Sequence, residues 1–255
     1  MRLLANDGAG TADLWQGLKQ GLLAGAALLV LTLPPGTRDG ASRGPLGQAG
    51  HAAASATEVI ERRLDFGAES PSADVRRLAT WVVAAADNGE RPFAIIDKVQ
   101  AQVFLFHPSG RLLAASPVLL GYARGDDSVP GIGQRPIALV RPSERTTPAG
   151  RYVAQPGRNA LDQGVLWVDY DAAVSMHRIR ASDPREQRAA RLASPSPSVK
   201  RISYGCINLP PAFYDEHFWP AFGKRTSVVY ILPEMKPLTA VFPALAAPAP
   251  GAAPA

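Results

Sequence analysis

Residues 92–118 read PFAIIDKVQAQVFLFHPSGRLLAASPV and contain three short runs of apolar or β-branched residues. The runs cover 92–96, 101–106 and 111–118, and the last two are separated by His107-Pro108-Ser109-Gly110, whose residues are typical of a turn. Short apolar runs with a turn between them predict a β-hairpin. We therefore expect this part of the chain to be built on β-strands.

The same pattern continues toward the C-terminus, with further strands expected at 151–155, 164–169, 173–179 and 226–232. Helices are expected at 72–87, where Val75, Leu78, Ala79 and Val82 have helical spacing, at 184–193, where Asp183 and Pro184 form a start signal with Glu186, and from Pro211 onward. Many short strands with few helices predict a mainly β fold, a sandwich or barrel with catalytic loops at the rim of the sheet.

Residues 121–150 form a long stretch with many glycines and prolines, GYARGDDSVPGIGQRPIALVRPSERTTPAG. It is longer than most connections in a compact domain, and such loops often cover a binding site. We expect either a loop that covers substrate or a static surface excursion.

Both ends of the chain differ from its middle. Residues 20–33 are an uncharged run that fits the apolar part of a signal peptide, and an extension back to Leu14 gives the length of a membrane span. We expect five parts: a signal peptide or membrane anchor (1–33), a flexible linker (34–56), a helical N-terminal extension (57–91), a catalytic domain (92–235) and a disordered Pro/Ala tail (236–255). Export is therefore expected, with residues 14–33 as the candidate membrane anchor.

The net charge of +5 would suit a polyanionic partner. The arginines are scattered, however, and no nucleic-acid-binding motif accompanies them. We therefore expect no nucleic-acid partner.

Cys206 is the single cysteine of the chain, and it lies in KRISYGCINLP at 200–210. A lone cysteine forms no intramolecular disulfide and no thiolate metal cage, so no metal site is expected there. Two interpretations remain, a buried inert residue and a reactive thiol. A reactive thiol needs a base, and His177 on an expected strand is the histidine that a rigid element would best position.

The neighbours of Cys206 fit a catalytic turn. Gly205 permits an unusual φ, so the amides of Gly205 and Cys206 are expected to face a developing oxyanion. Ser203 and Tyr204 are expected to orient the imidazole or to bind substrate. Asn208 is expected either to hold the turn or to contact substrate.

The run Ser203-Tyr204-Gly205-Cys206-Ile207-Asn208 resembles the active-site signature of the L,D-transpeptidases with a YkuD-type catalytic domain. Three features in the same order agree with this resemblance: the hairpin region at 92–121, the Thr-Pro-x-Gly turn at 147–150 with its following aromatic residue Tyr152, and the strand that ends near His177. The resemblance covers about 92–232. It implies an L,D-transpeptidase-like β-sandwich, preceded here by the hydrophobic segment and one amphipathic helix.

The resemblance also implies a reaction on peptidoglycan stem peptides. Cys206 would form a thioester with a tetrapeptide stem and release D-alanine, with His177 as base, Gly205, Tyr204 and Ser203 as oxyanion or supporting residues, and Asn208 and Tyr152 at the substrate. A second stem or an envelope protein would then supply the acceptor amine, in the periplasm or cell envelope, and no cofactor is implied. The alternatives are a carboxypeptidase or hydrolase of stem peptides and a catalytically silent peptidoglycan-binding protein.

Two features depart from the family pattern. Tyr204 occupies the position before Gly205 at which the family usually has histidine, and the interval between His177 and Ser203 is longer than usual. The first removes a supporting imidazole, and the second is expected to hold an inserted helix at 184–193 beside the active site.

Overall fold

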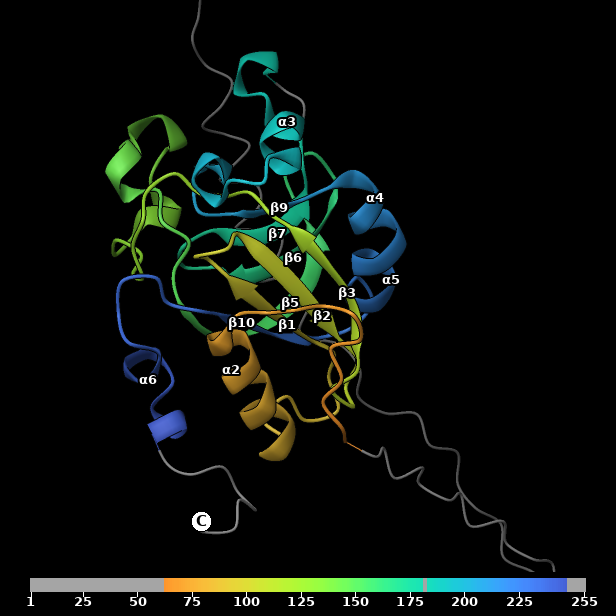
Figure 1. Cartoon of the computed structure of the whole chain (residues 1–255). Helices are drawn as coiled ribbons and strands as arrows, with labels where there is room; N and C mark the ends of the chain where they lie inside the picture. The colour runs from red at the N-terminus through yellow and green to blue at the C-terminus, as the bar shows by residue number, and fades with distance from the viewer. Residues whose placement is uncertain (1–61, 181–182, 247–255) are drawn as a thin grey trace, which may run out of the picture. The chain divides into compact units, whose positions relative to one another are not determined.

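The computed structural model describes residues 62–180 and 183–246 (Figure 1). The expected signal peptide or anchor at 1–33 and the linker at 34–56 lie outside the described residues. Among the helices of the described ranges, none has the length and apolar character needed to cross a membrane.

The described chain is mainly β with a few helices, as the sequence predicts. Eight strands form one mixed sheet in the order β3-β2-β1-β10-β5-β6-β7-β9, and β4 pairs with β8 in a second, two-stranded sheet. The strands are β1 (Phe93–Asp97), β2 (Gln102–Phe106), β3 (Leu112–Pro117), β4 (Leu120–Gly121), β5 (Gly150–Arg158), β6 (Gly164–Asp169), β7 (Val174–Arg178), β8 (Arg201–Ser203), β9 (Ile207–Leu209) and β10 (Ser227–Ile231).

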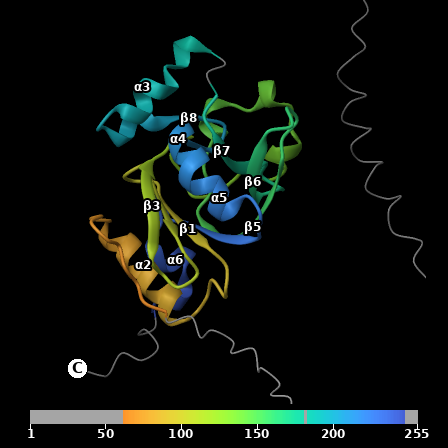
Figure 2. The ribbon, with the colours of Figure 1, turned by 90° about the vertical axis from the view of Figure 1, so that its right-hand side faces the viewer.

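Short helices connect and cover these strands. They are α2 (Ala73–Ala84), α3 (Arg188–Ala193), α4 (Pro211–Phe213), α5 (Trp219–Phe222) and α6 (Leu238–Val241), with 3₁₀ turns η1 (Ile132–Gln134), η2 (Ile137–Leu139), η3 (Pro142–Glu144), η4 (Pro184–Glu186), η5 (Pro197–Lys200) and η7 (Pro243–Ala246), and the π-helical stretch η6 (Tyr214–Phe218). Figures 1 and 2 both place α2 and α6 at one end of the fold and α3 at the opposite end.

Strand β5 bends the large sheet into two halves. Its first part, 150–154, pairs with β10, and its second part, 155–158, pairs with β6. Strands that change partners in this way make the corners between packed sheets. Because side chains from both halves meet in one buried cluster, the arrangement is a sandwich in which the two layers share a strand.

The central strand β1 has a fully buried side chain at every position from Phe93 to Ile96. Its side chains alternate between two core clusters: Ala94 and Ile96 face the cluster between the sheet halves, and Phe93 and Ile95 face the cluster beneath α2. Each fully buried large apolar side chain contributes on the order of 1.5–3 kcal/mol. The uninterrupted apolar run of 93–96 follows from burial on both faces of the sheet.

Helix α2 confirms its predicted apolar stripe. Val75, Leu78, Ala79 and Val82 are fully buried against the sheet. Ser72 caps the helix, since its hydroxyl accepts a hydrogen bond from the backbone N–H of Val75. The helix therefore covers one face of the sheet, at the end of the fold opposite to α3.

Two expected boundaries differ in the structure. Asp183 caps only the 3₁₀ turn η4, and α3 begins after Gln187, whose φ of 47° interrupts the helix. In the expected tail, residues 238–246 form α6 and η7 and bury Leu238, Phe242 and Leu245 in the cluster beneath α2. The Pro/Ala-rich composition hides these three widely spaced apolar anchors.

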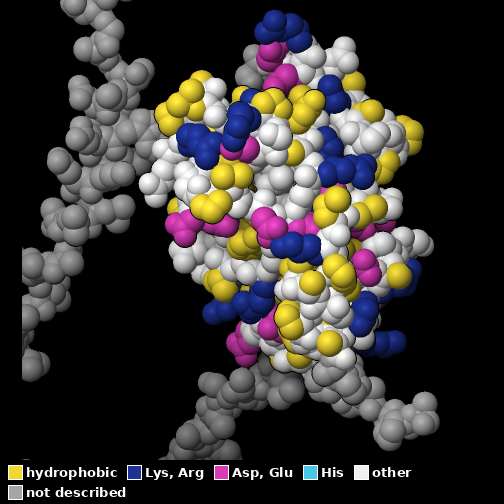
Figure 3. Space-filling model, turned by 90° about the vertical axis from the view of Figure 1, so that its left-hand side faces the viewer, with side chains coloured by type: hydrophobic (Ala, Val, Ile, Leu, Met, Phe, Trp, Pro, Cys, Tyr) yellow, Lys and Arg dark blue, Asp and Glu magenta, His cyan; other side chains and the backbone are white. Residues whose placement is uncertain are grey.

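Charge is dispersed on the face drawn in Figure 3, where basic, acidic and apolar side chains are mixed. Several basic side chains pair with nearby carboxylates, among them Lys236 with Asp127 at 2.6 Å and Arg178 with Asp215 at 2.9 Å. This dispersion agrees with the scatter of arginines along the sequence.

Candidate active site

The register of β7 and β9 assembles a polar group on one face of the sheet. The two strands are parallel, with Met176 beside Ile207 and His177 beside Asn208. Met176 and Ile207 are fully buried in the core, so the alternating side chains of Ser175, His177 and Asn208 share the other face. Cys206 directly precedes β9 and adjoins this group.

The thiol of Cys206 is half-buried, and its Sγ lies 3.7 Å from Ser175 Oγ and 3.6 Å from the carbonyl oxygen of Ala173. Burial raises the pKa of this thiol, but the neighbouring imidazole of His177 and contacts with Ser175 outweigh burial and lower the pKa overall. His177 on β7 and Cys206 just before the paired strand β9 thus lie close enough for the imidazole to influence the thiol, while their catalytic roles remain a prediction. Within the described ranges, no group of three or more His, Cys, Asp or Glu side chains is arranged to hold a metal.

Two contacts hold the imidazole of His177. Its Nδ1 lies 2.8 Å from the carbonyl oxygen of Arg178, and its Nε2 lies 3.0 Å from Nδ2 of Asn208. A carbonyl oxygen only accepts hydrogen bonds, so the first contact places a proton on Nδ1. In the neutral ring the lone pair is then on Nε2, where a general base needs it.

The turn before β9 is fixed by Ser203 and requires Gly205. Ser203 Oγ donates to the carbonyl of Cys206 at 2.6 Å and accepts from the N–H of Gly205 at 3.1 Å. Gly205 has a φ of 129°, and a Cβ there would lie 2.7 Å from the carbonyl oxygen of Thr146. Ser203 thus orients the backbone of the turn and not the imidazole.

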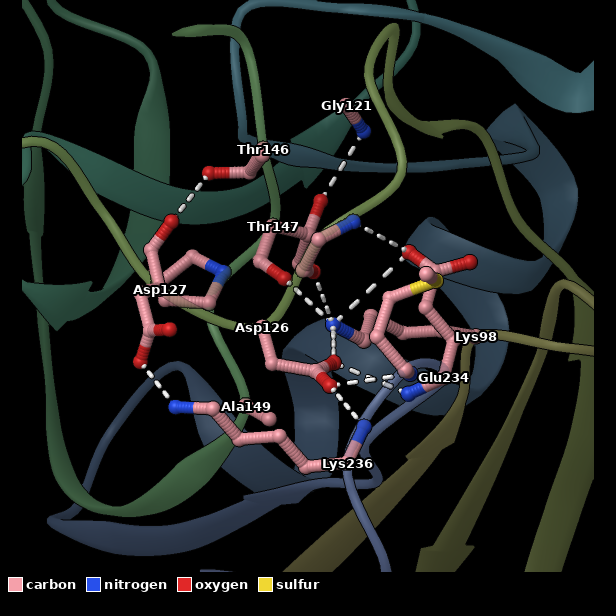
Figure 4. A network of polar contacts seen from close by, with 12 residues as sticks. Lys98, Gly121, Asp126, Asp127, Thr146, Thr147, Ala149, Glu234 and Lys236 are labelled. Atoms are coloured by element: carbon pink, nitrogen blue, oxygen red, sulfur yellow. Dashed lines mark hydrogen bonds and ion pairs between the residues drawn. The ribbon is translucent and has the colours of Figure 1, made fainter.

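Thr147 supports this turn from beneath. Its side chain is fully buried, and its Oγ1 donates to the carbonyl of Gly205 at 2.8 Å and accepts from the N–H of Gly121 at 2.9 Å. Its own carbonyl accepts a 2.9 Å hydrogen bond from Lys98 (Figure 4). Through Thr147, the Thr-Pro-x-Gly turn connects buried Lys98 to the turn at 203–206, called the cysteine turn below.

Lys98 is fully buried and joins several segments (Figure 4). Its Nζ donates to Asp126 at 2.7 Å and to the carbonyl of Gly125 at 2.6 Å, and it lies 3.8 Å from Glu234. Burial lowers the pKa of Lys98 in spite of these acidic partners, so the arrangement has a desolvation cost. Its clear effect is to fix the long loop at 121–150 against the sheet.

The two expected substrate residues, Asn208 and Tyr152, make hydrogen bonds within the protein. Asn208 is buried, and its side chain lies between His177 and Arg188. Tyr152 donates from its hydroxyl to the carbonyl of Ala149 at 3.3 Å, and burial raises its pKa to about 12. No hydrogen bond among the described residues joins Tyr152 to Cys206 or His177.

Tyr204 lies at the edge of the site and is 39% exposed. The guanidinium carbon of Arg145 lies 3.9 Å from the centre of its ring, and the same guanidinium donates twice to the carbonyl of Val140. The long loop therefore contacts the cysteine turn through a cation–π pair. This pair occupies the position where the family pattern has a histidine.

A cleft of about 510 Å³ lies against His177. Its lining includes Arg178, Arg180, Gln163 and Tyr214, while Cys206 is not part of it. Gln163 accepts two hydrogen bonds from Arg180, which orients that cation within the lining. The cleft offers room and positive charge beside the imidazole.

Three residues of this site were not predicted from sequence: Ser175, Arg145 and Arg188. The period of two along a strand points to Ser175, because it precedes His177 by two residues. The contacts of Arg145 and Arg188 depend on segments far away in the chain, for which the sequence contains no local signal.

Comparisons with known proteins give one set of matches. No family model and no curated protein matches this chain. Solved structures that match include an Ldtfm-avibactam carbamoyl enzyme, at 15% identity over 57% of this chain and 50% of that one, with a TM-score of 0.33. LD transpeptidase LdtMt1 in complex with imipenem matches at 17% identity over 56% and 60%, with a TM-score of 0.35.

The catalytic domain of the L,D-transpeptidase from E. faecium matches at 15% identity over 56% of this chain and 98% of that one, with a TM-score of 0.30. This chain thus spans half to three-fifths of the length of the first two structures. At these identities and TM-scores, the likeness does not establish what this chain does.

Proposed function

We propose that this chain is a cysteine-dependent acyltransferase of the L,D-transpeptidase type that acts on peptidoglycan stem peptides. The observation that carries the proposal is the half-buried thiol of Cys206, whose pKa is lowered by His177 against the effect of burial. A structural cysteine needs no such partner. The substrate class rests on the motif of residues 203–208 and on the Thr-Pro-x-Gly turn.

In the proposed reaction, Nε2 of His177 takes the proton of the Cys206 thiol while Sγ attacks the carbonyl that joins the third stem residue to the terminal D-alanine. The proton then passes to the leaving amine, D-alanine departs, and a thioester remains. An acceptor amine attacks the thioester and gives its proton to His177, which restores the thiol and leaves a new amide. Asn208 has to release Nε2 as the thiol proton arrives.

The oxyanion of this reaction is assigned to one backbone amide. The N–H of Gly205 already donates to Ser203 Oγ, so it is engaged in the turn. We therefore propose that the backbone N–H of Cys206 donates to the oxyanion that forms on the substrate carbonyl. The role of Gly205 is to allow the backbone conformation of the turn.

The cleft beside His177 supports a peptide substrate that carries carboxylates. Arg180 is held in the lining by Gln163, and Arg178 shares its charge with Asp215. Stem peptides carry free carboxylates that would pair with such a cation. We place the stem in this cleft, with its reacting carbonyl toward Cys206.

The site of action is proposed to be the periplasm or cell envelope, since peptidoglycan lies there. Residues 14–33 are proposed to direct export or to anchor the chain in the inner membrane, and either a second stem or an envelope protein is proposed as acceptor. Protease protection of the full chain in spheroplasts tests this placement, because an exported domain is digested while the cell membrane is intact.

The proposed chemistry is tested by acylation of the only cysteine. The full chain is mixed with a carbapenem, and intact-mass spectrometry is expected to show one adduct that Cys206→Ser lacks. The same protein is expected to release D-alanine from tetrapeptide stems. A wild-type chain that forms no adduct and releases no D-alanine would contradict the proposal and favour a silent peptidoglycan-binding protein.

A hydrolase would use the same residues with water as the acceptor. Chromatography of digested peptidoglycan separates the two outcomes, since transfer gives new cross-linked dimers and hydrolysis gives only shortened monomers. We expect cross-linked dimers when an acceptor stem is present.

A further inference from the structure

Arg188, the first residue of α3, contacts the polar group of the candidate site. Its Nη1 donates to Oδ1 of Asn208, the residue whose Nδ2 lies 3.0 Å from Nε2 of His177. Arg188 comes from the segment between β7 and β8, at the end of the fold that carries α3 in Figure 2. A relay of three side chains thus runs from α3 to the imidazole.

The chemistry of arginine determines the direction of this relay. A guanidinium has only donors, so the carboxamide oxygen of Asn208 must face Arg188 and the NH₂ group must face His177. An NH₂ group donates, so Nε2 of His177 must accept and carries no proton. The carbonyl of Arg178 requires the same tautomer from the other side of the ring, because it holds the proton on Nδ1.

The guanidinium is held in place before any substrate binds. Its Nε lies 2.6 Å from Oε2 of Glu186 and its Nη2 lies 3.3 Å from Oε1, so both carboxylate oxygens of Glu186 fix its plane. The side chain of Arg188 is only 14% exposed. Gln187, between the two, has a φ of 47°, a conformation that side chains other than glycine adopt rarely and that concentrates at functional sites.

We propose that Arg188 is a positioning residue: by fixing the carboxamide of Asn208, it keeps Nε2 of His177 unprotonated, so that this nitrogen can take the thiol proton of Cys206 once Asn208 releases it. The catalytic consequence rests on the function proposed above. The tautomer itself does not, since it is a property of the resting protein.

The experiment compares two arginines of the same helix in the full chain. Arg188→Met removes the donor to Asn208, whereas Arg191→Met removes a guanidinium whose hydrogen bonds to the described residues go to the backbone carbonyls of Glu186 and Val199. ¹⁵N spectra of the histidine side chains report which ring nitrogen is protonated, and the His177→Gln spectrum identifies the signals of His177. We expect an unprotonated Nε2 in wild type and R191M, and a substantial population protonated at Nε2 in R188M.

Two further variants keep the test decisive if R188M does not fold. Arg188→Lys retains a donor and is expected to restore the wild-type tautomer. Asn208→Asp presents an acceptor oxygen to both neighbours, so Nε2 is expected to become protonated. An unchanged tautomer in R188M, an equal change in R191M, or an unprotonated Nε2 in N208D overturns the proposal.

Acylation rates then connect the tautomer to the chemistry. We expect R188M to react with the carbapenem about tenfold more slowly than R191M, which corresponds to about 1.4 kcal/mol in the barrier. Equal rates overturn the catalytic part of the proposal. If wild type itself is not acylated, the proposed function fails, and the ¹⁵N spectra still decide the role of Arg188.

Discussion

At the residue scale, the candidate chemistry depends on how one imidazole changes one thiol. Burial alone would raise the pKa of Cys206, and the imidazole of His177 is the main cause that lowers it. The thiolate, which is the reactive form, therefore exists at lower pH than it would without the imidazole.

His177→Gln is expected to move the alkylation of Cys206 to higher pH, because burial then acts without the imidazole. The rate of reaction with iodoacetamide is measured against pH, and the single cysteine makes the signal unambiguous. His217→Gln is the matched control, since His217 packs against Phe213 and not against the thiol. An identical profile in wild type and H177Q would contradict the assigned coupling.

Gly205→Ala is expected to lower the free energy of unfolding by roughly 1–3 kcal/mol and to slow alkylation of Cys206. Its added Cβ would lie 2.7 Å from the carbonyl oxygen of Thr146 at a φ of 129°. Gly131→Ala isolates the clash, because Gly131 also has a positive φ, 70°, with no atom within 4 Å of the added Cβ. Urea unfolding measures both variants, and equal losses would show that the contact with Thr146 is unimportant.

At the element scale, the long loop at 121–150 is fastened at both ends to the core. Asp126 accepts from the backbone N–H groups of Glu234, Met235 and Lys236 as well as from Lys98. Thr147, at the other end, joins Lys98 to the cysteine turn. Because both of its ends are held, the static interpretation of this loop is favoured near the cysteine turn.

Stability is expected to fall in acid through Asp126. Burial raises the pKa of this carboxyl, but hydrogen bonds from Lys98 and three backbone amides outweigh burial and lower the pKa to about 2. The folded pKa lies below the ordinary value of 3.8, so the stabilisation is complete above that value and is lost as the pH falls toward 2. The contribution is on the order of 1–2 kcal/mol.

This contribution is measured by urea unfolding of wild type and Asp126→Asn, with the free energy of unfolding determined at several pH values from about 5 to about 2. We expect the difference in stability between them to shrink as the pH falls. Asp127→Asn is the control, because Asp127 is an exposed partner of Lys236. A difference that stays constant with pH would refute the role assigned to the Asp126 carboxylate.

Elements with a local signal were predictable from sequence, and those that depend on distant partners were not. The structure confirms the hairpin region predicted from the apolar runs at 92–118, which forms β1 to β3. It also confirms the helix predicted from the spacing of Val75 to Val82, which forms α2. The sequence contains no local signal for the burial of Lys98, since its partners lie 27 or more residues away. The contact of Asn208 with Arg188 was likewise not predictable, because Arg188 comes from the segment between β7 and β8, 20 residues away.

At the scale of the whole molecule, the two core clusters share one sheet. Strands β1, β2 and β10 contribute side chains to both clusters, so neither can be lost without exposing the other. The described domain is therefore expected to unfold in a single transition.

Leu78→Ala and Leu166→Ala test this coupling from opposite clusters. Each leucine is fully buried, and each truncation is expected to lower the free energy of unfolding by about 2–5 kcal/mol. Leu139→Ala, at a position that is 64% exposed, is expected to have little effect. Circular dichroism and tryptophan fluorescence should give coincident curves in every variant, and two separate steps would show that the clusters unfold independently.

The corner at β5 also limits how the gene can be cut and rejoined. Residues 150–154 and 155–158 belong to different half-sheets but to one continuous strand. If the chain is divided between Ala154 and Gln155, each fragment carries only half of β5, and the two half-sheets are no longer joined by a continuous strand. We therefore expect that these two fragments do not reassemble into the folded protein. A division in the exposed turn at 159–163 leaves the ribbon whole, and new termini for a circular permutant belong in that turn.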